Sequence, residues 1–383
     1  MFAAGITTFA LLYAPQALLP ELAHRFAISP ASSALSISVS TIGLGLALLV
    51  AGPLTELLGR TPLMFTSLIG ASVLGIAIAF VPNWPVLLAL RLVQGIALAG
   101  LPAVATAYLR EEVHHSVTAR ATGTYVGGTA LGGMLGRLVT GAVSDLFDWR
   151  LALGAVGVIG LGCAVAVVAL LPRSRNFVPA PASASQVLAT ARRVLTDPAL
   201  LALYGISFTL MGGFVGTYNA MGFRLAAPPY RLSVGLASLV FLAYALGSVS
   251  SSWAGRLADR FGQRTVVPLA IVLMLAGMAI TLMSPLPLVV LGICVLTIGF
   301  FAAHGVASGW VATRAALGGG GTGQAASLYL FAYYLGSSVI GTSTGLAWDR
   351  GHWPAVTLLV STLFAIGLVL SLLLRRIPKL GRD

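Results

Sequence analysis

Charged residues are scarce in this chain, since Asp, Glu, Lys and Arg together make up 8% of its 383 residues. Soluble domains carry about 25% charged residues. Hydrophobic residues make up 58% and the mean hydropathy is +0.96, so the chain cannot cover a surface that faces water. The composition therefore excludes a soluble globular protein and predicts an integral membrane protein.

Cysteine is nearly absent, and recognisable catalytic motifs are missing. Cys163 and Cys294 both lie in apolar runs, which indicates small packing residues rather than a disulfide or a metal site. The sequence contains no H-E-x-x-H metal motif and no P-loop lysine motif. We therefore expect no enzyme, no cofactor and no bound metal.

Apolar runs of about 20 residues, the length that crosses a bilayer as a helix, recur along the chain. A bilayer requires every backbone group to be paired within its own segment, so these runs are expected to be helices. Met1 lies at the edge of the first run, which has no basic leader, and we expect a truncated start rather than a signal peptide. The twelve expected spans are residues 2–21, 33–54, 63–81, 85–108, 119–144, 150–171, 199–222, 233–254, 266–283, 287–313, 323–346 and 354–374.

A polar turn of ten residues occurs twice, as GPLTELLGRT at residues 52–61 and GRLADRFGQR at residues 255–264. Both copies have glycine at the first and eighth positions, leucine at the third and a carboxylate at the fifth. Glycine suits a tight turn, and a carboxylate beside arginine suits an ion pair between helix ends. Further matches at a shift of 204, such as Tyr125 with Tyr329, predict that both halves run in the same direction.

The turn resembles the signature of the major facilitator superfamily, G-x-L-a-D-r-x-G-r-k. The second copy matches almost throughout, whereas the first has a glutamate for the aspartate and lacks one basic residue. The resemblance covers essentially the whole chain and implies an all-α membrane protein with twelve transmembrane helices in two parallel six-helix pseudo-repeats. It further implies a substrate path between the halves near the midplane. The residues that it assigns to a conformational latch are Gly52, Glu56, Gly59, Arg60, Gly255, Asp259, Arg260, Gly262 and Arg264.

Basic residues are distributed unevenly between the two sides of the expected bundle. Fifteen lie on the side of the two signature turns and five on the other side. Because cytoplasmic loops are enriched in basic residues, both termini are expected in the cytoplasm. This placement argues against a nucleic-acid partner despite the net charge of +12. The expected domains are an N-terminal bundle at 1–171, a cytoplasmic linker at 172–198 and a C-terminal bundle at 199–383.

Ionisable residues within the spans are few, and a charge there usually faces a cavity or a partner. The candidates for proton coupling are Glu21, Arg91, Arg137 and His304. Arg91 begins a stretch, RLVQG, that resembles the R-x-x-q-G motif associated with proton transfer in proton-coupled exporters. Glu21 is the one carboxylate that could reach either arginine from the outer end of the first span, and histidine changes charge near neutral pH. The alternatives are arginines bound to helix-end carbonyls or to a nearby carboxylate, a solvated Glu21 and a hydrogen-bonded core His304.

The fifth expected span is rich in glycine. Gly128, Gly132 and Gly136 recur every four residues, which predicts a smooth face for close helix packing. The span resembles the glycine-rich fifth-helix motif of antiporters in the superfamily, although Gly128-Thr129 replaces the Gly-Pro of that motif.

Aromatic and amide side chains at the expected cavity depth are candidate substrate contacts. Gln16 and Asn219 lie 203 positions apart, so each half offers an amide at a matching place. The first, fourth, seventh and tenth helices line the cavity in the superfamily, which adds weight to Gln16, Gln94, Asn219 and His304. The full candidate set is Tyr13, Gln16, Gln94, Arg137, Tyr218, Asn219, Tyr244, Tyr333 and Tyr334.

Within the superfamily the chain looks most like the twelve-helix drug/proton antiporters of bacteria. The resemblance implies a multi-pass monomer in the inner membrane that exports amphipathic drugs by proton-coupled alternating access. Two alternatives stay open: a proton-coupled transporter of an organic anion or a sugar, which two buried arginines would suit, and a receptor or scaffold without transport. The expected partners are a small-molecule substrate, protons and the lipid bilayer.

Overall fold

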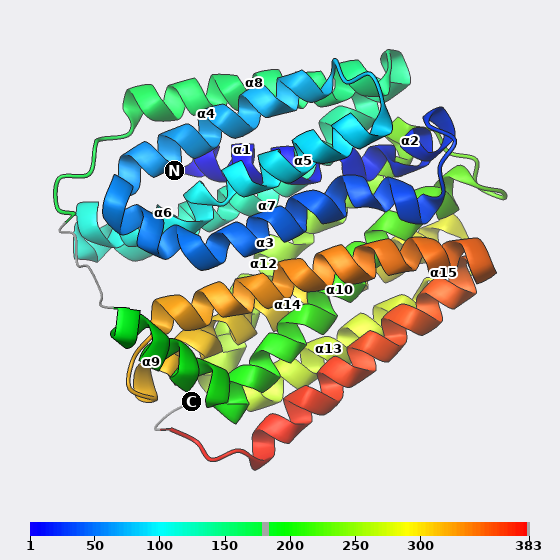
Figure 1. The fold of residues 1–383 in the computed structure, drawn as a ribbon. Coiled ribbons are helices and arrows are strands. Elements are labelled where there is room, and N and C mark those ends of the chain that lie inside the picture. Colours follow the sequence, from blue (N-terminus) through cyan, green and yellow to red (C-terminus); the bar gives the residue numbers. More distant parts are fainter. Residues whose placement is uncertain (178–183, 381–383) are drawn as a thin grey trace. The chain divides into compact units, whose positions relative to one another are not determined.

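The structure, a computed structural model, describes residues 1–177 and 184–380; within these ranges the side chains of Gly52, Pro53, Glu56, Leu57, His115, Ala119 and residues 184–187 are outside the description. Every regular element in this part of the chain is a helix (Figure 1). Ten described segments are long and apolar enough to cross a membrane. One of them, Thr322–Arg376, holds two of the expected spans, and helix α7 (His115–Leu146) covers another. The predicted twelve-helix membrane fold is therefore confirmed.

The helices group into two compact units, which we call unit 1 (Met1–Pro181 with Met221–Leu242) and unit 2 (Ala182–Ala220 with Ala243–Asp383). The elements of unit 1 are α1 (Phe2–Tyr13), η1 (Ala14–Leu18), α2 (Leu19–Arg25), α3 (Pro30–Leu58), α4 (Arg60–Ile78), α5 (Trp84–Leu98), α6 (Gly100–Glu112), α7, α8 (Trp149–Leu170) and α11 (Val234–Ser238). Those of unit 2 are α9 (Ala184–Thr196), α12 (Tyr244–Phe261), α13 (Gln263–Ile280), α14 (Leu286–Leu317), α15 (Thr322–Leu373) and η3 (Leu374–Arg376). Two elements, α10 (Pro198–Ala226) and η2 (Leu239–Ala243), contribute residues to both units.

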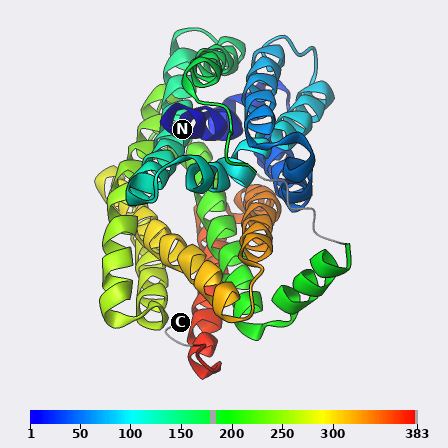
Figure 2. The same cartoon turned by 90° about the vertical axis from the view of Figure 1, so that its left-hand side faces the viewer.

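The first membrane-crossing segment is discontinuous. Proline lacks a backbone N–H and clashes with the preceding turn, and Pro15 and Pro20 each stand in the first turn of a new element, η1 and α2 respectively. The segment therefore changes from α-helix to 3₁₀-helix and back. Helix α1, dark blue in Figure 2, contacts α3, α4, α5, α7 and α8, so it is the central helix of unit 1.

Helices α1 and α7 pack with their backbones in close approach. A Cβ atom added at Gly128, Gly132 or Gly136 would lie under 3.0 Å from a backbone oxygen of α1. The three oxygens that the added Cβ atoms would meet belong to Phe2, Ile6 and Ala10, which also recur every four residues. The packing face predicted from the glycine spacing is thus confirmed, and only residues without a side chain fit it.

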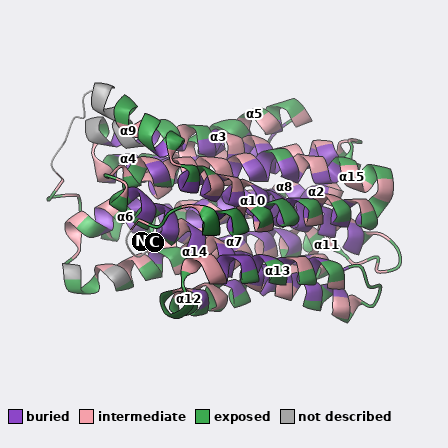
Figure 3. Ribbon diagram, turned by 90° about the horizontal axis from the view of Figure 1, so that it is seen from below, coloured by how far each residue is buried: buried purple, intermediate pink, exposed green. Residues whose placement is uncertain are grey.

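Helix α13 of unit 2 has one buried face and one exposed face. Its buried residues, among them Val267, Ile271 and Met274, recur every three or four positions, and the exposed face between them includes Leu269 and Val272. Figure 3 shows this alternation of buried and exposed residues along the helices. The exposed face is apolar as well, as expected for a helix that meets lipid rather than water.

The two signature turns have the same backbone conformation. Gly59 ends α3 with φ of 82°, and Gly262 ends α12 with φ of 83°. Each donates its N–H to the carbonyl four residues earlier, at 2.9 Å to Thr55 and 2.8 Å to Ala258. Residues with a Cβ rarely adopt this left-handed region. The glycine at the eighth position of each copy is therefore required by the turn.

Two features of the fold were not expected from the sequence. The stretch expected as a linker contains helix α9, and Asp197 at its end accepts a hydrogen bond from Arg314 Nε at 3.0 Å. In addition, residues from Met221 to Leu242 belong to unit 1, although they follow the sequence midpoint. Periodicity identifies a helical face but does not identify the helix that the face contacts.

Candidate functional site

Arg91 on α5 is a fully buried brace between helices of unit 1. Its Nη1 donates to the backbone oxygen of Leu11 at 2.9 Å and to Gln94 Oε1 at 2.6 Å. Its Nε donates to the backbone oxygen of Ser36 at 2.8 Å, and its Nη2 donates to that of Leu12. These bonds join α5 to α1 and α3, and they satisfy a cation that is 1% exposed. The geometry supports the structural alternative for Arg91, in which it binds helix carbonyls.

Gln94 extends the same brace to α4. Its Nε2 donates to the backbone oxygen of Ala71 at 2.8 Å while its Oε1 accepts from Arg91. Ser40 of α3 donates to the backbone oxygen of Arg91 at 2.7 Å, and Gly95 lies directly against the backbone of Ser40. The RLVQG stretch is thus the place where α3, α4 and α5 meet.

Arg137 on α7 is the second buried cation of unit 1, and its surroundings are aromatic. Its Nε donates to Gln16 Oε1 at 2.6 Å, and its Nη1 donates to the backbone oxygen of Gly133. Its guanidinium carbon lies 4.4 Å from the ring centroid of Tyr13 and 4.9 Å from that of Phe241. The structure therefore brings together three candidates, Tyr13, Gln16 and Arg137, with an additional ring from η2.

The break in the first crossing segment positions this cluster. Gln16 lies in η1, directly after Pro15, so its amide projects from an interrupted helix. Thr140, one turn after Arg137, donates to the backbone oxygen of Ala14 at 2.9 Å and holds α7 against the break. Interrupted helices with polar side chains near the bilayer midplane recur at the binding sites of secondary transporters.

The segment that carries Phe241 is fastened to α7 within unit 1. Ser233 caps α11 by accepting from the N–H of Leu236 at 3.3 Å, and its hydroxyl donates to Asp145 Oδ2 at 2.5 Å. Ser238 lies so close to Gly141 that a Cβ there would approach its hydroxyl oxygen to under 3.0 Å. Helix α11 and the start of η2 are thereby held beside the C-terminal part of α7.

Glu21 on α2 has its hydrogen-bond partners on α7 and α8. Its carboxylate accepts hydrogen bonds from Ser144 Oγ and from the backbone N–H of Trp149. Glu21, the one carboxylate that could have reached Arg91 or Arg137, is therefore bound by neither arginine. Donors at the end of α7 and the start of α8 bind this carboxylate, whereas Arg91 and Arg137 donate to backbone carbonyls and to glutamine side chains.

The amide in the second half has a different neighbour from the amide in the first. Asn219 Nδ2 donates to the backbone oxygen of Gly341 at 3.1 Å. At the repeat shift of 204, Gly341 corresponds to Arg137. The matching amides therefore meet a guanidinium in unit 1 and a helix carbonyl in unit 2. Superposing the two sequence halves would have revealed this asymmetry in advance.

Unit 2 contains an aromatic cluster that joins α10, α12, α14 and α15. Phe214 and Phe300 stack at 3.8 Å between ring centroids, and Tyr218 and Tyr244 lie 5.3 Å apart. Phe301 approaches Tyr244 at 5.6 Å. The sequence analysis selected both tyrosines but missed the three phenylalanines, because phenylalanine in an apolar span carries no polar signal.

His304 lies at one end of this cluster. Its Nδ1 is 3.0 Å from the hydroxyl of Tyr329, and its ring is 4.8 Å from that of Tyr333 and 5.7 Å from that of Phe300. Tyr334, also a candidate, is buried beside Tyr333 with their centroids 5.1 Å apart. His304, Phe301 and Tyr333 are only partly buried. This part of the cluster therefore offers a titratable ring and two further rings to a ligand.

The signature turns differ in their ion pairs. Arg60 forms a 2.9 Å ion pair with Glu111 at the end of α6, whereas Asp259 is exposed and makes no ion pair with any described side chain. Arg264 donates to the backbone oxygen of Ile377 at 2.8 Å. Gly52 and Glu56 lie outside the described side chains, so the latch assigned to these turns stays a prediction.

The Arg60–Glu111 pair should contribute measurably to stability. It is bidentate, and its side chains are only 13% and 26% exposed, so Glu111→Gln should lower the free energy of unfolding by about 1 kcal/mol. Asp259→Asn, which removes an exposed carboxylate, should leave it unchanged. A double-mutant cycle with Arg60→Gln in urea unfolding measures the coupling, and a coupling energy of zero would contradict the ion pair.

Comparisons with known proteins agree with the fold. Residues 1–341 match the family model described as Major Facilitator Superfamily. The chain is 41% identical over 379 residues to the MFS-type transporter YybF of Bacillus subtilis, covering 99% of this chain and 93% of that protein. It is 40% identical over 376 residues to the inner membrane transport protein YnfM of Escherichia coli, covering 98% and 89%.

Solved transporters have the same fold at low sequence identity. A bacterial homologue of the human lysosomal transporter Spinster, in an inward-facing and unoccupied conformation, superposes with a TM-score of 0.78 at 15% identity over 98% of this chain and 95% of that one. The nucleoside transporter NupG superposes with a TM-score of 0.75 at 13% identity over 99% and 98%. The chain therefore belongs to the major facilitator superfamily and is a multi-pass membrane transporter of small molecules rather than an enzyme.

Proposed function

We propose that the chain is a secondary transporter that exports aromatic, amphipathic cations in exchange for protons. The observation that carries this proposal is the position of His304, a titratable ring packed against Phe300 and Tyr333 and only partly buried. Aromatic rings attract cations through their electron-rich faces. A protonated imidazole and a cationic ligand would compete for the same rings of unit 2.

This competition supplies an exchange mechanism without a carboxylate in the middle of a span. In neutral His304 one ring nitrogen is an acceptor, and protonation makes both nitrogens donors. The Tyr329 hydroxyl, 3.0 Å from Nδ1, must then act as the acceptor. Protonation thus places a positive charge inside the cluster, weakens binding of the cationic ligand and couples its release to proton uptake.

The remaining predicted properties belong to the same proposal. We infer a monomer in the bacterial inner membrane with both termini in the cytoplasm. In chain order it has an N-terminal bundle at 1–171, a linker at 172–198 and a C-terminal bundle at 199–383, of which Met221–Leu242 belong to unit 1. Transport would proceed by alternating access. The two signature turns would act as the cytoplasmic latch, with Arg60 and Glu111 as its described ion pair.

An organic anion is the second candidate substrate, and the cluster around Arg137 favours it. The guanidinium is held between the rings of Tyr13 and Phe241 and is oriented by Gln16. The cluster is buried in this structure. When alternating access opens it, a carboxylate or phosphate on an aromatic ligand would find a charge and stacking surfaces in one place. Arg137→Ala should then abolish anion transport and spare the transport of cations.

Transport by purified protein in liposomes with an imposed pH gradient tests both candidates. Cationic dyes should accumulate in response to the gradient with the unaltered protein, and His304→Gln, which keeps a polar side chain but does not titrate, should remove that response. His114→Gln removes an exposed histidine and should behave as the unaltered protein. A gradient response that survives in His304→Gln would reject the role of His304 as the coupling group, and anion transport that depends on Arg137 would select the second candidate.

A further inference from the structure

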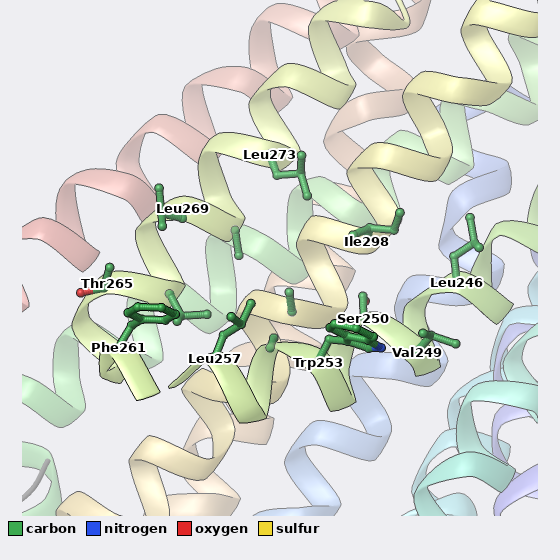
Figure 4. Close-up of a pocket in the computed structure, with 14 residues that line it drawn as sticks. Leu246, Val249, Ser250, Trp253, Leu257, Phe261, Thr265, Leu269, Leu273 and Ile298 are labelled. Carbon is green, nitrogen blue, oxygen red and sulfur yellow. The ribbon is translucent and has the colours of Figure 1, made fainter. Parts of the chain in front are cut away.

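A long apolar groove runs along unit 2 between α12, α13 and α14 (Figure 4). Its volume is about 800 Å³, and only two of its lining residues, Ser250 and Thr265, carry a hydroxyl. The Ser250 hydroxyl already donates to the backbone oxygen of Gly247 at 2.9 Å. The groove therefore provides an apolar trough rather than a polar binding site.

The groove is longer than one leaflet of a bilayer is thick, so it has room for a whole acyl chain. Its lining on α12 extends from Leu246 to Phe261, which corresponds to about 22 Å at about 1.5 Å per helical residue. Half of a typical hydrocarbon core is about 15 Å thick. An acyl chain could therefore lie along the groove with its headgroup near the turn between α12 and α13.

Two arginines stand at that end of α12, each over an aromatic ring that lines the groove. The guanidinium carbon of Arg256 is 4.9 Å from the ring centroid of Trp253, and that of Arg260 is 5.1 Å from that of Phe261. Both arginines are exposed. At about 100° per residue, Asp259 lies on the opposite side of α12 from the groove lining, so it does not offset their charge there.

We propose that this groove binds an anionic phospholipid of the surrounding bilayer, with an acyl chain along α12 and the phosphate at Arg256 and Arg260. The apolar lining binds the chain, and the two guanidinium groups select the charge of the headgroup. A cationic amphiphile would meet like charge at this end of the groove, and a zwitterionic lipid would gain less from the arginines. The proposal is independent of the transported substrate.

Native mass spectrometry of the full chain, released from detergent with phosphatidylglycerol or phosphatidylcholine, tests the proposal. A basic residue near the membrane surface contributes about 1 kcal/mol toward an anionic lipid, or about fivefold in affinity. Arg256→Gln combined with Arg260→Gln should therefore reduce the preference for phosphatidylglycerol by about 30-fold. Arg110→Gln combined with Arg120→Gln removes two exposed arginines elsewhere and should leave the preference unchanged.

Filling the groove gives a second test that leaves the charges in place. Ser250→Phe should reduce retention of phosphatidylglycerol, whereas Ser252→Phe, on the other side of the same helix, should not. Equal retention of the two lipids by the unaltered protein would overturn the proposal. A preference for phosphatidylglycerol that survives both the arginine and the Ser250 substitutions would also overturn it. The proposal would likewise fail if a cationic amphiphile displaced bound lipid at a lower concentration than phosphatidylglycerol does.

Discussion

Replacing Gly132 with alanine should cost unit 1 several kcal/mol of stability and reduce the yield of folded protein sharply. The added Cβ would lie under 3.0 Å from the backbone oxygen of Ile6, and a backbone oxygen cannot rotate away as a side chain does. Overpacking usually costs about 1–3 kcal/mol, and here it would force α1 and α7 apart along the whole glycine face. Fluorescence-detected size-exclusion chromatography and thermal unfolding of the purified protein measure the loss.

The same helix supplies a matched control with the opposite expected sign. No atom lies within 4 Å of a Cβ built on Gly127, and alanine is favoured over glycine in a helix interior by about 1 kcal/mol. Gly127→Ala should therefore be neutral or stabilising. Gly336 contacts the backbone of Phe208 in unit 2 as Gly132 contacts Ile6 in unit 1, so Gly336→Ala should repeat the defect. Equal stability of Gly132→Ala and Gly127→Ala would contradict the close packing.

Replacing Arg91 with glutamine should have the second large effect. The substitution leaves the backbone oxygens of Leu11, Leu12 and Ser36 without their donor in a buried position. Each buried acceptor that loses its donor costs about 1–3 kcal/mol, so the loss summed over the three acceptors is on the order of 3–9 kcal/mol. Thermal unfolding of the purified protein should show a large fall in Tm at every pH.

Arg91→Lys separates a structural role from proton transfer. Lysine keeps the charge but lacks the planar fork that reaches several acceptors at once, so a structural Arg91 predicts that most of the stability is lost. A proton-transfer group predicts instead that Arg91→Lys folds normally and shifts the pH profile of transport. Arg120→Gln, which removes an exposed arginine, is the control for the loss of one positive charge.

The helical framework was predictable because its causes are local. A run of about 20 apolar residues must be helical in a bilayer, and the spacing of Gly128, Gly132 and Gly136 specifies one face of one helix. The duplicated turn, with a glycine at its eighth position in both copies, predicted the backbone reversal at Gly59 and Gly262. Each of these features depends on residues within one or two helical turns.

The partners of the buried polar groups were less predictable. The sequence left open whether Glu21 would reach an arginine or be solvated, and it binds Ser144 and the backbone of Trp149. For Arg91 the carbonyl-bound alternative was open from the start, but the sequence did not indicate which helices would supply the carbonyls. A backbone oxygen is present at every residue, so its availability depends on how the helices approach one another.

The sequence by itself determined a duplicated, twelve-helix membrane protein, because composition, segment length and the repeated turn are properties of the chain before it packs. The resemblance of that turn to the superfamily signature implied a transporter. Only the tertiary structure decided which partners its few buried polar side chains have. It made Arg91 a brace across α1, α3 and α5, set Arg137 between two rings and placed His304 at the end of an aromatic cluster. The physical reason is that a side chain's charge state and partners depend on neighbours from distant helices, whereas helix formation in lipid depends on the segment itself.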